Sequence, residues 1–427
     1  MMRIVEVLLV GGFAAGWLAF HRAAISRRDR SLLAILLLFD VLCGGLAVVA
    51  VASPALFVRW MQEDSWVEWS TFAAFAAAAI VTGAALVRSW RSPGPLVASL
   101  PRWLRTLGFA GLAAFCLFVA GEEISWGQRL LGLEPPEVFL AHNAQQELNL
   151  HNFLKDQEVL AVDLDSRYLV AMIAIGYAGL LPGLAALLRR RRPAWAAPVE
   201  AFSPPLPLVP WFAAVVACEL IYPVELGGEA CELVLGVLFL VDALLRHAAA
   251  TSAPDAAAPR RAALAIGAAF AFGVAAPVVV DGALSGADLE RTAQAQGELQ
   301  ELARDLVAPG TLQPRLRTKS VHKRVFTAVQ AGYLVFAADS QFLGGAARRD
   351  RVGYFLDPWN NPYWIRHARR SDAVLLYSFG PNRRRDSDLD RSSRLGGDDI
   401  GVEVSLTPPP TEVSSALTDA SESEVPR

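Results

Sequence analysis

The chain has 427 residues, of which 54% are hydrophobic and only 19% are charged, with a formal net charge of −3. Soluble domains average about 25% charged residues, and the shortage here lies in the first two thirds of the chain, where long apolar runs follow one another. This balance excludes a strongly basic, nucleic-acid-binding protein and predicts an integral membrane protein.

Eight apolar segments predict an α-helical polytopic domain over residues 1–283, because about 20 apolar residues cross a bilayer. The segments are 4–20, 32–52, 66–88, 104–122, 168–188, 207–222, 229–246 and 262–281. The sixth and seventh are short, and the proline and glycines of residues 222–229 between them predict irregular backbone. Four cysteines in or beside these runs are interpreted as buried apolar side chains: Cys43, Cys116, Cys218 and Cys231.

Charge alternates from one connection to the next. The first, third, fifth and seventh connections are rich in arginine, the fifth being the run Arg189–Arg192, whereas the others are poor in basic residues and carry acids. Arginine-rich connections remain in the cytoplasm. We therefore expect a protein of the inner (plasma) membrane, with its N-terminus and everything after the eighth segment outside the cytoplasm.

Polar residues gather where the fourth segment ends. Glu122 and Glu123 close it, and Trp126 and Arg129 follow Glu122 at helical spacing, which predicts one shared helix face. The next connection adds His151, whose imidazole titrates near neutral pH. Ionisable groups in membrane segments usually face a protein interior or a cavity.

A second acidic cluster opens the seventh segment. Glu225, Glu229 and Glu232 are spaced i, i+4, i+7, and three carboxylates on one face repel unless a proton, a cation or an arginine joins them. An arginine fits this role, and glutamate with histidine can instead hold a divalent metal. Both clusters are expected on the same side of the membrane, so we expect these groups to converge: Glu122, Arg129, His151 and Glu229. The alternative is a polar network that only pins helix ends together.

The string Glu-Glu-Ile-Ser-Trp-Gly-Gln-Arg at residues 122–129, followed by Asn-Leu-His-Asn at 149–152, resembles a signature of uncharacterised bacterial polytopic membrane proteins. The resemblance implies no particular activity.

Residues 284–404 predict a small soluble α+β domain. Ser285 and Asp288 have the spacing of a capping box, and a helix to about Val307 follows. Residues 362–367 and 373–379 alternate in polarity and predict a β-hairpin. Residues 405–427 are rich in Pro, Ser, Thr and Glu, a composition that predicts disorder.

Three blocks of this domain are similar to the C-terminal part of the type II secretion system major pseudopilin (protein G). They are Leu-Asp-Pro-Trp-Asn-Asn-Pro-Tyr at 356–363, Leu-Tyr-Ser-Phe-Gly at 376–380 and Gly-Gly-Asp-Asp-Ile at 396–400. The resemblance covers about 50 residues and implies a helix that carries a small sheet and a calcium loop outside the cytoplasm. The chain lacks the processing motif of that family, so we expect no pseudopilin-like processing or polymerisation.

The segment between Asn382 and Ile400 is the predicted calcium loop. Calcium binds six to eight oxygens from carboxylates, carbonyls and water. The resemblance points mainly to the acidic pair after Gly396-Gly397, and the loop also contains an Asp-x-Asp-x-Asp run. The candidate ligands are Asp386, Asp388, Asp390, Asp398 and Asp399. The alternative is an acidic loop neutralised by its own five arginines.

Three functions remain open from the sequence. The leading one is a membrane protein that displays a pseudopilin-like domain outside the cytoplasm, in contact with membrane lipid and secretion-system proteins, for secretion or surface assembly. The second is a membrane-embedded metal-dependent hydrolase, and the third is a transporter that uses the broken region at 222–229. Candidate catalytic residues for the hydrolase are Glu122, Glu123, Arg129, His151, Glu229 and Glu232.

Overall fold

The computed structural model has two units, Met1–Gly286 and Ala287–Arg427. It describes the chain apart from residues 1, 62–63, 95–96, 144–145, 151–152, 154–157, 160–161, 164–165, 221–226, 250–257, 285–287, 308–318, 321–334, 337–354, 368–372, 388–393 and 406–427. The predicted tail at 405–427 therefore lies almost wholly outside the described residues.

The first unit is helical. Its helices are α1 (Met2–Ser26), α2 (Arg30–Ala52), α3 (Pro54–Trp60), α4 (Trp66–Arg91), α5 (Arg102–Glu123), α6 (Gln128–Leu131), α7 (Glu137–His142), α9 (Ser166–Ile175), α10 (Leu181–Arg191), α11 (Pro193–Phe202), α12 (Val209–Leu220), α13 (Gly227–Ala249) and α14 (Ala258–Leu284). A π-helical turn, Gly176–Leu180, joins α9 to α10. Two strands of two residues each, β1 (Glu158–Val159) and β2 (Val162–Asp163), pair antiparallel.

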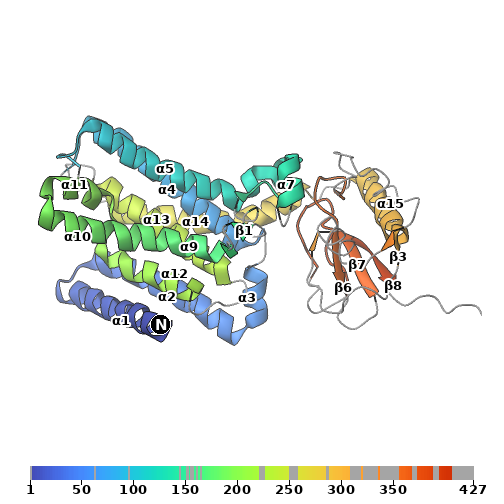
Figure 1. Ribbon diagram of the computed structural model, residues 1–427, viewed down its shortest axis with the longest axis horizontal. Coiled ribbons are helices and arrows are strands. Elements are labelled where there is room, and N and C mark those ends of the chain that lie inside the picture. The colour runs from blue at the N-terminus through green and yellow to red at the C-terminus, as the bar shows by residue number, and fades with distance from the viewer. Residues whose placement is uncertain are drawn as a thin grey trace, which may run out of the picture. The chain divides into compact units, whose positions relative to one another are not determined.

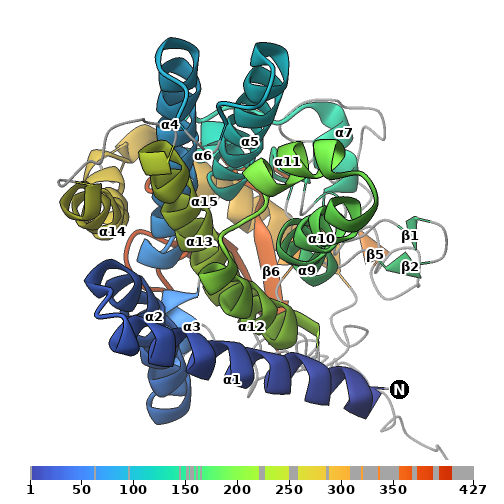
Figure 2. The same ribbon diagram turned by 90° about the vertical axis from the view of Figure 1, so that its left-hand side faces the viewer.

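Helix α13 forms the centre of this unit. Every residue from Leu233 to Ala243 is buried, as expected for a helix that is apolar on all sides and covered by others. Helix α4 packs against α13, α5 and α14, while α12 packs against α13, α1 and α9. Figure 2 looks along the bundle and shows α12 and α13 between the α1–α2, α4–α5 and α9–α10 groups.

All eight predicted segments are helical over their described residues. Five of them lie in helices long and apolar enough to cross a membrane: Arg30–Ala52, Trp66–Arg91, Arg102–Glu123, Tyr168–Arg191 and Ala262–Leu284. A sixth candidate, counted over the described residues, is the bent pair formed by Pro193–Phe202 and Leu206–Leu220, which meet at 54°. These helices run alongside one another in Figure 1, and their apolarity indicates a membrane-embedded protein.

The arginine run after the fifth segment was predicted to be a loop, and that prediction is wrong. Helix α10 continues to Arg191, and α11 begins at Pro193 after the single residue Arg192. Proline at the first turn of a helix leaves no required N–H unsatisfied, so the chain reverses with almost no loop. The arginines occupy the last turn of α10, where cations interact favourably with the helix dipole.

The second unit is a helix packed on an antiparallel sheet. Helix α15 (Leu289–Asp305) contacts β7 (Ala373–Ser378) and β8 (Ile400–Ser405), and Leu299 and Leu302 are buried. The sheet order is β4-β6-β7-β8, where β4 is Lys319–Ser320 and β6 is Trp364–His367. A separate pair joins β3 (Leu306–Val307) to β5 (Val335–Phe336).

The predicted hairpin is confirmed, because β6 pairs antiparallel with β7 and places Trp364 opposite Tyr377. The predicted helix ends earlier than expected. Asp305 is its last residue, and Leu306 belongs to β3. Asp288 caps α15 directly, since its Oδ1 accepts a hydrogen bond from the Arg291 N–H at 3.1 Å; Ser285, its proposed capping partner, lies outside the described residues.

Candidate functional site

The end of α5 is a left-handed turn rather than a continued helix. Ser125, Trp126 and Gly127 have φ values of 45°, 54° and 77°. This left-handed region costs non-glycine residues free energy, so tertiary contacts must hold Ser125 and Trp126 there. The indole of Trp126 folds back and donates to Glu122 Oε1 at 2.8 Å. The predicted helix face of Glu122, Trp126 and Arg129 is therefore wrong, although Glu122 and Trp126 do meet.

The segment formed by residues 146–150 is held against this turn. The N–H of Leu150 donates to Glu122 Oε2 at 2.6 Å, and the N–H of Leu148 donates to Gln128 Oε1 at 2.6 Å. Glu122 is only 6% exposed and both of its carboxylate oxygens accept hydrogen bonds. Its role in this arrangement is to hold the segment and the indole in place.

Arg129 joins two acids from different parts of the sequence. Its guanidinium forms ion pairs with Asp64, which precedes α4, and with Glu147. The second carboxylate oxygen of Glu147 accepts from Ser125 Oγ at 3.0 Å and from Asn149 Nδ2 at 2.8 Å. The described contacts thus pair Arg129 with Asp64 and with Glu147, which belongs to the connection after the fourth segment.

Glu123 brings the two predicted clusters together. The carboxylates that act on it electrostatically are Glu232, Glu229, Glu68 and Glu122, in order of decreasing effect. Glu68 lies in the first turn of α4, and Glu229 and Glu232 lie in the first two turns of α13. Carboxyl groups from three helix ends therefore lie within electrostatic range of Glu123. We call Glu68, Glu122, Glu123, Glu229 and Glu232 the Glu123 cluster.

The remaining members of the predicted membrane site cannot be placed. His151 and Glu225 lie outside the described residues, as do residues 222–226 of the proposed broken region. Within the described part of the chain, the Glu123 cluster contains no three carboxylates whose oxygens all lie within 4.8 Å of one another. A metal held there would need a further ligand or a closer approach of these side chains.

A second buried polar site, which the sequence analysis missed, lies within the bundle. Asp242 and Arg246 of α13 form an ion pair at 2.7 Å, with side chains 0% and 3% exposed. Tyr177 Oη donates to Asp242 at 2.5 Å and accepts from Arg246 at 3.0 Å. Arg246 also donates to the carbonyls of Ala201 and Ser203, so four of its five N–H groups have partners.

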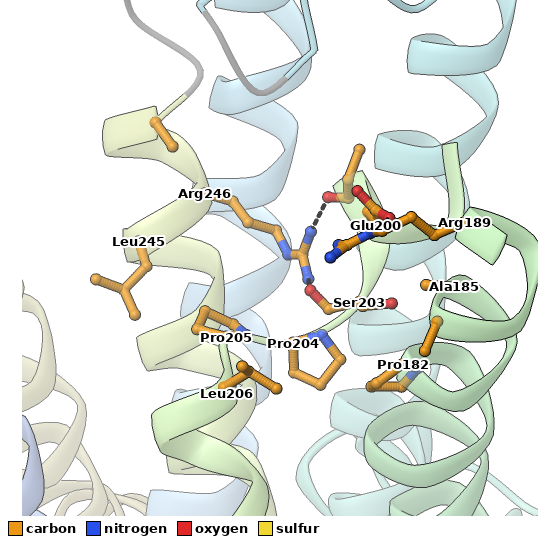
Figure 3. Close-up of a pocket in the computed structure, with 13 residues that line it drawn as sticks. Pro182, Ala185, Arg189, Glu200, Ser203, Pro204, Pro205, Leu206, Leu245 and Arg246 are labelled. Carbon is orange, nitrogen blue, oxygen red and sulfur yellow. Dashed lines mark hydrogen bonds and ion pairs between the residues drawn. The ribbon is translucent and has the colours of Figure 1, made fainter. Parts of the chain in front are cut away.

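This site borders a cavity of about 580 Å³. Figure 3 shows Arg246 reaching the backbone at Ser203, with the Arg189–Glu200 ion pair nearby and Pro204, Pro205 and Leu206 below it. Arg189 and Arg246, the cations of this cavity, are paired with Glu200 and Asp242. These ion pairs hold α10, the bent pair α11–α12 and α13 together.

Asp40 was also overlooked in the sequence. It lies in the middle of α2 and accepts hydrogen bonds from Trp17 Nε1 at 2.7 Å and from His21 Nε2 at 2.9 Å, both on α1. A single acid in an otherwise apolar run was the available signal, because such residues seek a partner in the membrane.

In the second unit the acidic loop brings together three of the five predicted calcium ligands. Asp386, Asp398 and Asp399 each offer a carboxylate oxygen within 4.8 Å of the others, which fits one ion with Ca–O distances of about 2.4 Å. Gly397 has φ +58°, and a Cβ on it would lie 1.9 Å from Asp386 Oδ2, so glycine is required for this approach. Asp388 and Asp390 lie outside the described residues.

Burial raises the pKa of Asp398 from 3.8 to about 7 and that of Asp399 from 3.8 to about 6. Because the folded protein holds these protons more tightly than the unfolded chain, the two groups favour folding at low pH, and this contribution is lost as the pH rises through about 6 to 7. A cation that binds the charged carboxylates would offset the loss.

We therefore expect calcium to raise the melting temperature of the second unit at pH 8 and to have little effect at pH 5. Differential scanning fluorimetry of the full-length protein in detergent, with and without 2–5 mM calcium as a roughly saturating concentration, measures this. The Asp399→Asn variant provides the control, since it removes one carboxylate of the three. No shift at pH 8 would leave a loop that neutralises itself, and an equal shift at both pH values would mean that calcium acts somewhere other than on these carboxylates.

No family model matches this chain, and neither a curated protein nor a solved structure matches it.

Proposed function

We propose that the protein is an eight-span component of the bacterial plasma membrane that displays a pseudopilin-like domain outside the cytoplasm, where the domain binds secretion-system proteins. Helices α1 and α13 and the bent pair α11–α12 would add the spans beyond the five apolar helices. Every second connection is rich in arginine. This alternation supports an N-terminus and a second unit that both lie outside the cytoplasm.

The main support for this proposal is the structure of the second unit. Helix α15 packs on an antiparallel sheet that includes β6, β7 and β8, and the Asp-Pro-Trp turn precedes β6. Tyr363 Oη of that turn donates to Glu298 of α15 at 2.7 Å, which ties the turn to the helix. A helix bearing a small sheet with an acidic loop is the layout that the resemblance implies.

Surface labelling tests the topology on which this proposal depends. In a cysteine-free background, a membrane-impermeant maleimide applied to intact cells with a permeable outer membrane is expected to label Gln294→Cys in α15. It should not label Arg190→Cys at the end of α10. Both positions are exposed in the structure, so a difference in labelling would not come from burial of one side chain. Labelling of Arg190→Cys alone would contradict the topology.

Binding is tested by copurification. We expect the full-length chain in detergent to retain secretion-system proteins in millimolar calcium. A Gly397→Asp variant, which places a side chain where Asp386 lies, is expected to release them. Retention of the same partners by the variant would exclude the acidic loop from the binding surface.

A metal-dependent hydrolase remains a second candidate because of the Glu123 cluster, in which four carboxylates from three helix ends act electrostatically on Glu123. Since like charges repel, a bound cation would stabilise their ionised forms. Glu123, Glu229 and Glu232 are the residues proposed to hold it, with His151 as a further candidate, whereas Glu122 is occupied by Trp126 and Leu150.

Metal content of the purified full-length protein tests this candidate. We expect Glu123→Gln to lower the bound divalent metal at least tenfold without changing the elution profile of the protein. Glu134→Gln is the matched control, because Glu134 is an exposed loop residue. Equal metal content in wild type and Glu123→Gln would remove the hydrolase from consideration.

A further inference from the structure

Two cysteines, Cys218 of α12 and Cys231 of α13, line one cavity. Each thiol interacts electrostatically with the other, and Cys231 also interacts with Glu219. Cys218 is exposed and Cys231 is buried. Both line a cavity of about 220 Å³, together with Glu219 and the apolar residues Leu46 and Val234. Two thiols and a carboxylate that line one cavity differ from isolated buried cysteines.

We propose that Cys218 and Cys231 are a redox-active dithiol that exchanges with disulfide compounds. The geometry assigns a different role to each sulfur. Cys218 is accessible, so its thiolate attacks the oxidant, and Cys231 is the buried resolving thiol. This inference goes beyond display of the second unit and does not depend on the orientation of the chain.

The exchange balances in two steps. The thiolate of Cys218 attacks one sulfur of a disulfide R–S–S–R, forming a mixed disulfide and releasing one R–S⁻, which takes up a proton. Cys231 then gives its proton to the Glu219 carboxylate and attacks the Cys218 sulfur, and the second R–S⁻ leaves and takes that proton from Glu219. One disulfide is reduced to two thiols, while the two protein thiols are oxidised to one disulfide.

The other two cysteines have different surroundings. Cys43 of α2 also borders the cavity and lies near Cys218, which makes it the competing partner. Cys116 of α5 is buried against the core, and Asp242 is the charged group acting on it. A disulfide closed between α12 and α13 would covalently join the two sides of the chain segment 219–230, which includes Glu229 of the Glu123 cluster.

The test uses purified full-length protein in detergent and oxidised glutathione as the probe. After acid quenching and denaturation, free thiols are counted by the gel shift from a polymer-tagged maleimide. The wild type should lose two of its four tags. Cys116→Ser should fall from three tags to one, whereas Cys218→Ser should keep three. Cys231→Ser should stop at the first step and carry one glutathione on Cys218.

Peptide mapping identifies the bond in the wild type and does not depend on any variant folding. Trypsin leaves both cysteines in one peptide, since residues 193–245 contain no lysine or arginine, so cleavage after glutamate is used to separate them. A Cys218–Cys231 linkage supports the proposal. Four free thiols in oxidised wild type, a Cys43–Cys218 linkage, or glutathione on Cys231 in the Cys218→Ser variant would each overturn it.

Discussion

Replacing Arg246 with methionine is expected to lower the free energy of unfolding by about 3–5 kcal/mol, because it leaves the carboxylate of Asp242 buried without its cation. Asp242 is fully buried, and Arg246 also bridges α13 to Tyr177 and to the carbonyls of Ala201 and Ser203. One change therefore removes an ion pair and the contacts that hold the bent segment. Size-exclusion elution and thermal unfolding in detergent measure the loss of folded protein.

Two variants separate this effect from a general loss of an arginine. Arg189→Met removes the exposed Arg189–Glu200 pair, and exposed ion pairs contribute only about 0–1 kcal/mol. The double variant Asp242→Leu/Arg246→Met removes both buried charges and should recover much of the stability lost in Arg246→Met. If Arg246→Met proves no more destabilising than Arg189→Met, the buried network does not hold the bundle together.

The positions of the helices could be predicted from the sequence because apolar length is a local property. The five apolar helices all coincide with predicted segments, and α13 follows the seventh one. The ends of the helices could not be predicted as well. At the end of α5 the spacing of Glu122, Trp126 and Arg129 favoured a continued helix, yet hydrogen bonds from Leu148 and Leu150 hold a left-handed turn there. Those partners come from a segment about 20 residues away, which helical periodicity does not reveal.

Part of the buried network around Arg246 could have been predicted from the sequence. Asp242 and Arg246 are four residues apart in an apolar run, a spacing that allows an ion pair within one helix. Their other partners, Tyr177 and the carbonyls at 201 and 203, follow from how α9–α10 and α11 pack against α13. Such packing depends on the whole bundle, so those contacts required the structure.

Strand β8 has a pattern that the sequence already contains. Residues 400–405 alternate between less and more exposed side chains in β8, and their sequence Ile-Gly-Val-Glu-Val-Ser shows the same alternation. Ile400 was predicted only as the end of the acidic loop. The strand instead pairs with all of β7, from Ala373 opposite Ser405 to Ser378 opposite Ile400, and fixes the position of the Asp398–Asp399 pair that precedes it.

Asp357 organises the turn that begins this sheet, and replacing it with alanine is expected to cost the second unit about 3 kcal/mol of stability. Its Oδ1 accepts from the N–H groups of Trp359 at 3.0 Å and Asn361 at 2.9 Å, and its Oδ2 accepts from Ser378 Oγ at 2.5 Å. The side chain is fully buried, so alanine would leave two backbone donors without a partner, each costing roughly 1–3 kcal/mol.

The isosteric change Asp357→Asn distinguishes the shape of this turn from its charge. The amide oxygen of asparagine can still accept from Trp359 and Asn361, and its NH₂ group can donate to Ser378 Oγ, so we expect a loss of only about 1 kcal/mol. Asp288→Ala, which removes the cap of α15, should also cost about 1 kcal/mol. Limited proteolysis of the full-length protein in increasing denaturant, followed by the loss of the second unit, ranks the three variants. Equal losses for Asp357→Ala and Asp288→Ala would mean that the buried carboxylate contributes no more than an exposed helix cap, and the turn would then depend on its prolines and aromatic packing instead.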